Sequence, residues 1–317
     1  MQGYLGIDVG SVSTNVVILD INNNVKASLY LRTNGQPIQA IQEGMHVVYK
    51  ELDKDFKILG VGVTGSGRQL AGAVVGADVI KNEITAHAVA ALTMVPGVRT
   101  ILEIGGQDSK IILLRDGVVT DFAMNSICAA GTGSFLDQQA SRLKIPIEEF
   151  GDLAIQSQSQ VRIAGRCTVF AESDMIHKQQ MGHSKEDIIR GLCEALVRNY
   201  LNNVGKGKEI LANVVFQGGV AANKGIIQAF ESALGTKVIV PEYYNVMGAV
   251  GAALLAKEHV ASVGSTKFKG FSVTQETFNG KSFDCSGCSN NCEIVEISMG
   301  KEIVGRWGGR CDKWEIS

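Results

Sequence analysis

The chain has 317 residues, of which 45% are hydrophobic and 20% charged, so it carries enough apolar side chains for a sizeable core and is not largely disordered. Thirty Lys and Arg residues face 32 Asp and Glu residues with no basic block, which argues against a surface devoted to nucleic acid or anionic lipid. The longest apolar run, 246–256, is shorter than the ~20 residues of a membrane helix, and the N-terminus does not resemble a signal peptide. We therefore expect a cytoplasmic protein with no nucleic acid and no membrane among its partners.

The first third of the chain alternates between strand-like and helix-like patterns. Runs of β-branched and apolar residues predict strands, and apolar residues at helical spacing predict helices. The expected strands are 3–9, 15–20, 26–32 and 56–63, and the expected helices include 37–52 and 84–94.

The pattern then restarts. Strands are expected at 99–104, 110–114 and 118–122, a mainly helical stretch at 131–203, a strand at 210–216, and helices at 221–234 and 246–257. Residues 5–10 and 102–107 both read as strand, glycine turn and polar residues, which indicates a weak internal duplication about 100 residues apart. We predict an α/β protein with three parts: lobe I at 1–95, lobe II with cluster-binding cysteines at 96–260, and a cysteine-rich module at 261–317.

Three glycine turns carry polar residues that suit a nucleotide. In the first, Gly10, Ser11, Val12, Ser13 and Thr14 can offer backbone N–H groups and hydroxyls to phosphates, and Asp8 can hold Mg²⁺ through water. In the second, Glu103, Gly105, Gly106, Gln107 and Asp108 can orient Mg²⁺ and an attacking water. The third places Gly218, Gly219 and Asn223 between a strand and a helix, where a flat group can approach the backbone.

Each turn alone is also typical of an ordinary polar loop, but their order is informative. Two such hairpins in duplicated lobes, followed by a late Gly-Gly, resemble the actin, hexokinase and sugar-kinase superfamily of ATPases. That resemblance implies a duplicated two-lobe fold that binds ATP or ADP with Mg²⁺ between its lobes, with Asp8, Glu103, Gln107 and Asp108 as catalytic residues. Gly131 and Gly133 join the expected nucleotide-binding glycines.

Cys128 and Cys167 each lie where small or capping residues precede a helical pattern. A helix N-terminus favours negative charge, so both sulfurs are biased toward thiolate, the usual ligand of iron–sulfur clusters. The plain alternative is two buried small residues.

The sequence segments around these cysteines, and others like them along the chain, are more specific than the cysteines alone. Segments 6–11, 64–68, 104–108, 128–133 and 167–173 together resemble the 2-hydroxyacyl-CoA dehydratase activators (component A, or archerases) and the related benzoyl-CoA reductase ATPase subunits and reductases of double-cubane-cluster proteins. The resemblance implies a homodimer that shares one 4Fe-4S cluster, held by Cys128 and Cys167 of each chain. Two thiolates doubled by a twofold axis give the four that a cubane usually needs.

The resemblance also implies partners and a coupling. A ferredoxin or flavodoxin donates a low-potential electron, ATP closes the lobes, and the electron passes to an acceptor iron–sulfur enzyme, either a dehydratase or a double-cubane-cluster protein. Two residues depart from the family pattern: Asn15 stands where Lys is frequent, and Glu103 where Asp is usual.

The last segment adds Cys285, Cys288, Cys292 and Cys311. Four thiols at this spacing suit either zinc or a second 4Fe-4S cluster, with free thiols or disulfides as the alternative. For the whole chain, a sugar or small-metabolite kinase and a nucleotide-dependent redox sensor are the other functions considered.

Overall fold

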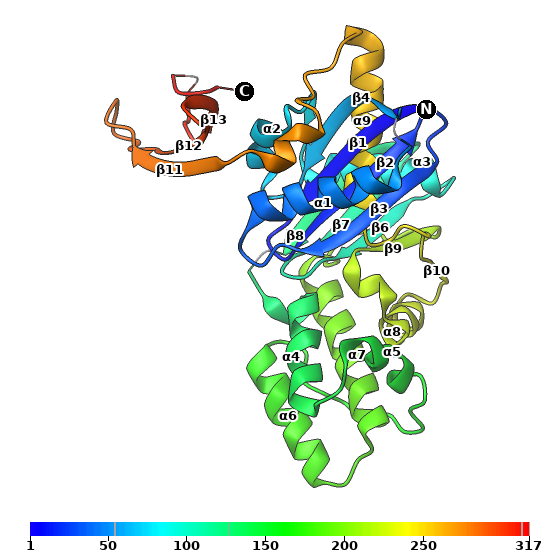
Figure 1. The fold of residues 1–317 in the computed structure, drawn as a ribbon. Coiled ribbons are helices and arrows are strands. Elements are labelled where there is room, and N and C mark those ends of the chain that lie inside the picture. The colour runs from blue at the N-terminus through cyan, green and yellow to red at the C-terminus, as the bar shows by residue number, and fades with distance from the viewer. Residues whose placement is uncertain (54, 126, 312, 317) are drawn as a thin grey trace. The chain divides into compact units, whose positions relative to one another are not determined.

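The computed structural model describes residues 1–53, 55–125, 127–311 and 313–316. They form two compact units, one made of residues 1–90 with 248–317 and the other of residues 91–247. Each unit contains one five-stranded sheet with helices packed on it, so the predicted α/β class is confirmed (Figure 1). None of the helices in the described ranges is long and apolar enough to cross a bilayer. The three-part division expected from the sequence stays a prediction.

The sheet of the first unit has the order β3-β2-β1-β4-β5. β1 is antiparallel to β2 and parallel to β4, so the polypeptide makes a hairpin and then a helical crossover. The strands are β1 Gln2–Val9, β2 Ser13–Asp20, β3 Val25–Arg32, β4 Lys57–Thr64 and β5 Val79–Ile80. All four strands predicted in this region are confirmed.

Helices cover both faces of this sheet. Helix α1 packs on one face of the sheet (Figure 1). This face contains Val16, and a methyl group on Gly44 of α1 would lie 2.6 Å from Val16 Cγ2. Helix α9 packs on the opposite face, where a methyl group on Gly6 would lie 1.9 Å from the carbonyl oxygen of Ala249. Glycine at this position is therefore what lets α9 approach the strand so closely. The helices are α1 Pro37–Glu51, α2 Arg68–Val75, α3 Glu83–Met94 and α9 Met247–Val263.

The sheet of the second unit repeats this topology. Its order is β10-β9-β6-β7-β8, with β6 antiparallel to β7 and parallel to β9. Each strand thus has a counterpart five positions earlier, which confirms the duplication seen in the sequence. The strands are β6 Thr100–Ile104, β7 Ser109–Arg115, β8 Val118–Asn125, β9 Val214–Gln217 and β10 Val238–Ile239.

The helices of this unit form its second layer and enclose a large apolar core. They are α4 Gly133–Leu143, α5 Ile147–Ala154, α6 Thr168–Gln180, α7 Lys185–Asn203 and α8 Lys224–Leu234, with the short 3-10 helices η1 Ala129–Gly131 and η2 Gly219–Ala222. Helix α8 begins later than the predicted residue 221 because η2 precedes it and Asn223 caps it, accepting a bond from the Ile226 N–H at 3.1 Å.

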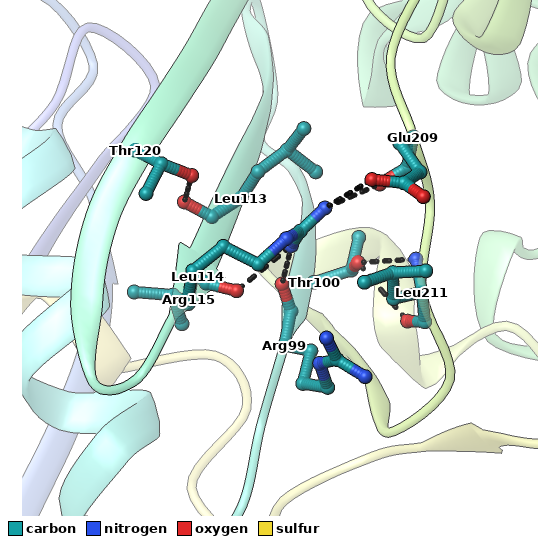
Figure 2. Close-up of polar contacts among 8 residues, drawn as sticks. All are labelled: Arg99, Thr100, Leu113, Leu114, Arg115, Thr120, Glu209 and Leu211. Carbon is teal, nitrogen blue, oxygen red and sulfur yellow. Dashed lines mark hydrogen bonds and ion pairs between the residues drawn. The ribbon is translucent and has the colours of Figure 1, made fainter.

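The predicted strand at 210–216 is too long, since β9 begins only at Val214. Side chains hold the preceding segment outside the ladder. Thr100 Oγ1 donates to the Leu211 carbonyl at 3.1 Å and accepts from its N–H at 3.2 Å, while the Arg115 guanidinium donates to the Glu209 carbonyl at 3.1 Å (Figure 2). These bonds satisfy backbone groups that a strand would otherwise pair, so no strand is needed here.

The cysteine-rich end of the chain contains strands that the sequence did not suggest. Strands β11 Phe278–Asp284, β12 Glu293–Met299 and β13 Glu302–Trp307 form an antiparallel sheet, preceded by the 3-10 helix η3 Phe271–Gln275. Strand β13 packs on α2, where Gly305 lies against Ala73.

Candidate functional site

A polar row crosses the end of the first sheet. Asp8 on β1 pairs in register with Asn15 on β2 and with Thr64 on β4, so the three side chains share one face. The Asp8 carboxylate fills the space above two glycines: a methyl group on Gly65 would lie 2.5 Å from its Oδ1, and one on Gly248 2.1 Å from its Oδ2. Gly248 belongs to the first turn of α9, where a negative charge is favourable.

The neighbours of Asp8 in this row carry buried oxygens that lack partners. Asn15 Oδ1 and Thr64 Oγ1 have no hydrogen-bond partner among the described residues, and Asn15 and Thr64 are 6% and 0% exposed. Buried polar atoms are normally satisfied, so such a pair beside a carboxylate suits a hydrated ion. The donors are all oxygen, which fits Mg²⁺.

The glycine hairpin next to this row is only partly available to a ligand. Gly10, Ser11, Val12 and Ser13 form its exposed or half-buried tip. Thr14 is fully buried, and its hydroxyl hydrogen-bonds that of Thr33 at 3.0 Å. The Thr14 hydroxyl therefore stabilises the hairpin.

An equivalent row crosses the second sheet with different chemistry. Glu103 on β6 pairs in register with Lys110 on β7 and Gln217 on β9. Lys110 Nζ donates to Glu103 Oε2 at 3.1 Å and to Asp108 Oδ2 at 2.9 Å. The side chains of Lys110 and Glu103 are 3% and 6% exposed, whereas that of Asp108 is 33% exposed. One buried ammonium thus binds two of the predicted catalytic carboxylates.

The second glycine turn is fixed by the helix that follows Cys128. The N–H groups of Gly133 and Ser134, at the start of α4, donate to the carbonyls of Gly105 and Gly106 at 2.9 and 2.8 Å. A methyl group on Gly105 would lie 2.9 Å from Asp108 Oδ1. Gly105, Gly106 and Gly133 therefore form one structure that positions the Asp108 carboxylate, and the nucleotide contact expected of these glycines stays a prediction.

The third glycine turn lies against the same carboxylate row. Gly218 has a φ of +89°, and a methyl group there would lie 2.7 Å from Glu103 Oε1 and 2.4 Å from the Ile104 carbonyl. Only glycine fits both the conformation and the space. Gly219 begins η2, and the Asn223 amide oxygen caps α8, so the nucleotide contact expected of Asn223 stays a prediction.

Cys128 and Cys167 are half-buried, and each is the residue that precedes a helix, as the sequence predicted. Asn125 holds the first loop: its Oδ1 accepts the Cys128 N–H at 3.0 Å and its Nδ2 donates to the Cys128 carbonyl at 2.8 Å. Asn199 on α7 holds the second, since its Nδ2 donates to the Gly165 carbonyl at 2.6 Å.

Asn199 also connects the two cysteine loops. It is 5% exposed, and a methyl group on Gly131, just after Cys128, would lie 2.8 Å from its Oδ1. Helices α4 and α6, which follow the cysteines, lie side by side (Figure 1). They are also joined by side chains, because Glu172 on α6 pairs with Arg142 and accepts a bond from Gln138 on α4. The two loops are thus parts of one framework.

Exposed apolar side chains flank both cysteines. Ile127 is 97% exposed, Val169 67% and Phe170 65%; Phe122 and Met124 on β8, which leads to Cys128, are also exposed. Large apolar side chains gathered beside two functional groups are typical of a surface that another protein covers.

Sequence reasoning did not include Lys110 and Asn199 among the site residues. Lys110 was visible as a cation two residues after Asp108, but its pairing with Glu103 depends on strand register. Asn199 gave a weaker signal, an amide on the apolar side of a long helix.

Cys193 and the tail cysteines differ from this pair. Cys193 is fully buried, and burial raises the pKa of its thiol to about 12, so it is an inert core residue. Cys285 is buried at the end of β11 and accepts bonds from the Trp314 Nε1–H at 3.1 Å and the Gly287 N–H at 3.4 Å. These bonds lower the pKa of the Cys285 thiol.

Over 1–53, 55–125, 127–311 and 313–316, no three His, Cys, Asp or Glu side chains are arranged to hold a metal within one chain. A cluster shared by two chains takes only two ligands from each and is untouched by that result.

Two sheets of the same order, each ending in a carboxylate row beside glycine turns, form a duplicated α/β fold that the solved dehydratase activators share. Residues 5–256 match the BadF/BadG/BcrA/BcrD ATPase family, and the chain belongs to that family.

Comparison with individual proteins agrees with this family assignment. The chain is 36% identical over 266 residues to the (R)-2-hydroxyglutaryl-CoA dehydratase activating ATPase of Acidaminococcus fermentans, covering 81% of this chain and 98% of that protein. It is 36% identical over 263 residues to the activator of lactoyl-CoA dehydratase of Anaerotignum propionicum, covering 80% of this chain and 97% of that protein. The solved activator of the 2-hydroxyisocaproyl-CoA dehydratase from Clostridium difficile, with bound ADPNP, superposes with a TM-score of 0.75 at 34% identity, covering 83% of this chain and 97% of that one.

Proposed function

We propose that this protein is an ATP-dependent electron-transfer activator, a homodimer whose Cys128 and Cys167 pairs hold one bridging 4Fe-4S cluster and whose partner is an acceptor iron–sulfur enzyme. The observation that carries the proposal is the framework around the two cysteines. Their loops share Asn199, both thiols stay half-buried, and exposed apolar side chains surround them.

The residues fit such a cluster in chemistry and number. Sulfur ligands from Cys suit iron, and two from each of two copies complete the usual four. When bound, such a cluster would supply one-electron transfer. The chain's own part is to present the thiolates at helix starts, where negative charge is favoured, and to exclude water with Ile127, Val169 and Phe170.

For the nucleotide, we assign Mg²⁺ and phosphate handling to the two carboxylate rows. Asp8 holds Mg²⁺ through water, with Asn15 and Thr64 as further oxygens. Gln107 and Asp108 orient the attacking water, and the turns at Gly10–Ser13 and at Gly105, Gly106, Gly131, Gly218 and Gly219 offer backbone groups to the nucleotide. The relative solved with ADPNP supports nucleotide binding.

Thermodynamic linkage explains how ATP binding is coupled to electron transfer. ATP can shift the conformation only by binding one state more tightly than the other, so the state competent for the acceptor is the one that ATP prefers. A ferredoxin or flavodoxin supplies the electron. Activators of three different hydroxyacyl-CoA dehydratases are among the relatives, which supports a dehydratase as the acceptor.

We further propose that Cys285, Cys288, Cys292 and Cys311, which the described structure does not gather into a metal site, come together as a separate thiolate site when zinc or a second cluster binds. Three lie in the loop between β11 and β12, and the fourth follows β13, which pairs with β12 so that its end lies beside the start of β12. The Trp314 and Gly287 N–H groups donate to the Cys285 sulfur, and hydrogen bonds of this kind support a thiolate ligand.

Anaerobic purification tests the bridging site. We expect about four iron and four sulfide per two chains from Cys128 and Cys167, a dimer by light scattering, and ATPase activity. Cys128→Ala and Cys167→Ala should each lose this iron and weaken the dimer, while Cys193→Ala, matched in chemistry but buried in the core, should keep both. Cys285→Ser with Cys311→Ser isolates any metal of the tail. A colourless monomer that phosphorylates a sugar would refute the proposal.

A further inference from the structure

A strongly basic groove lies beside Cys167 in the second unit. It encloses about 1160 Å³ between the loop before Cys167 and helices α6 and α7. Its lining includes five cationic side chains, Arg162, Arg166, Lys178, Arg198 and Lys206, and among the described lining residues one carboxylate, Asp174. Because the whole chain has a net charge of −2, this is a local concentration of positive charge.

The carboxylates near the groove neutralise it only in part. Asp174 Oδ2 accepts the Ala164 N–H at 2.8 Å and so serves the loop. Glu194 lies 3.8 Å from Arg198 but bonds Arg190 more closely, at 3.0 Å. Burial, and to a lesser degree the neighbouring Arg162, lower the pKa of Arg198. Like charges held together cost free energy, and an anionic partner would recover it.

The position of the groove indicates what that partner does. Arg166 directly precedes Cys167, and Phe170, one turn further along α6, also lines the groove and is 65% exposed. A protein bound here would lie next to one of the two cysteines of the proposed bridging site. An exposed aromatic side chain ringed by cations is a common centre of a protein interface.

We infer that this groove docks the acidic face of a low-potential electron-donor protein. Negative charge around a redox centre makes its reduction harder and lowers its potential, so a donor of very low potential is expected to carry excess carboxylates. The inference rests on the proposed function, because it assigns the surface through which that function receives its electron.

A protein fits the groove better than a small anion does. Arg162, Arg166 and Lys206 are exposed, and the cations are spread over a loop and two helices. Pockets for small ligands instead bury most of the ligand among a few convergent polar groups.

The test measures binding directly. A fluorescently labelled ferredoxin is titrated with the purified full-length protein at low and at 0.3 M salt. Arg162→Glu combined with Lys206→Glu should weaken binding about 10- to 100-fold at low salt, with the difference shrinking as salt screens the charges. Lys185→Glu, an exposed lysine of the same unit outside the groove, is the matched control and should change binding by less than about twofold.

The outcomes separate the two proposals. Equal binding by the groove variant and the control, or loss of the dimer in the groove variant, overturns the docking inference whether or not iron is present. Competition by millimolar pyrophosphate or coenzyme A, with no ferredoxin binding, overturns it in favour of a small-anion pocket. Ferredoxin binding at the groove by a chain without iron supports the docking surface and refutes the bridging cluster.

Discussion

The two sheets have the same strand order and register, but their carboxylate rows differ. In the second unit the row contains a buried cation, Lys110, which pairs with Glu103 and Asp108. In the first unit the strands on either side of Asp8 contribute Asn15 and Thr64, both uncharged. The duplicated scaffold thus supplies carboxylates partly neutralised by a buried lysine in one unit and an oxygen-rich row suited to an added cation in the other.

Of the variants that test this difference between the rows, Lys110→Met should lower the free energy of unfolding most. It leaves two carboxylates beside a buried site without their cation, which costs about 3–5 kcal/mol of unfolding free energy in comparable buried pairs. Denaturant unfolding measures the loss, and adding Glu103→Gln should recover part of it. Asn15→Leu at the corresponding position of the first unit should cost less than about 1 kcal/mol, because it also removes an unpartnered buried amide oxygen. Equal losses for Lys110→Met and Asn15→Leu would contradict the difference between the rows.

Gly6→Ala tests the close approach of helix α9 to strand β1, which the first sheet makes possible with a glycine. The new methyl group would meet the Ala249 carbonyl on α9, and we expect a loss of about 3 kcal/mol, the upper range for overpacking. The register-equivalent position of the second sheet is Ile101, so that sheet tolerates a side chain there. Gly235→Ala, at an open position with φ +65°, is the control and should cost about 1 kcal/mol. A smaller loss at Gly6 than at Gly235 would show that α9 can move away.

Asp187 makes the second unit sensitive to acid. Its carboxylate accepts the Ser159 and Gln158 N–H groups and the Ser157 hydroxyl, and these bonds lower the pKa of Asp187 from 3.8 to about 2. A carboxyl with a lowered folded-state pKa stabilises the fold fully above its unfolded pKa, and loses this as the pH falls. About 2 kcal/mol should therefore disappear between pH 4 and pH 2.

Urea unfolding across that pH range provides the measurement. Asp187→Asn should flatten the decline. Asp20→Asn is the comparison from the first unit: Asp20 accepts N–H bonds in the same manner and these lower its pKa too, but they lie at the surface, so this substitution should flatten the decline less than Asp187→Asn does. An unchanged pH profile in Asp187→Asn would contradict the assignment.

Sequence patterns predicted most of the elements of the two sheets because alternation and glycine turns are local signals. The patterns overpredicted a strand where side-chain hydrogen bonds take the place of strand pairing, as between Thr100 and Leu211. They also missed the short strands β11 to β13. The glycine turns and the cysteines at helix starts were visible for the same reason. The Glu103–Lys110 pair and the Asn199 link were not, because they depend on register and on packing between residues up to 70 positions apart.

Asn15→Lys places a cation beside Asp8, as Lys110 lies beside Glu103 in the second sheet. Its effect, on Mg²⁺ affinity, should be the smallest in free energy. If Asp8 holds hydrated Mg²⁺, an ammonium group beside it competes with the ion, and the apparent Mg²⁺ affinity should fall about tenfold, or about 1.4 kcal/mol. Calorimetric Mg²⁺ titration in the presence of ATP measures this, and ATP binding without Mg²⁺ should not weaken, since a lysine also attracts phosphate. Asn15→Asp is the matched variant of opposite charge and should tighten Mg²⁺ binding. If both variants leave the titration unchanged, Mg²⁺ does not bind at this row, and the neutral neighbours of Asp8 serve only the sheet.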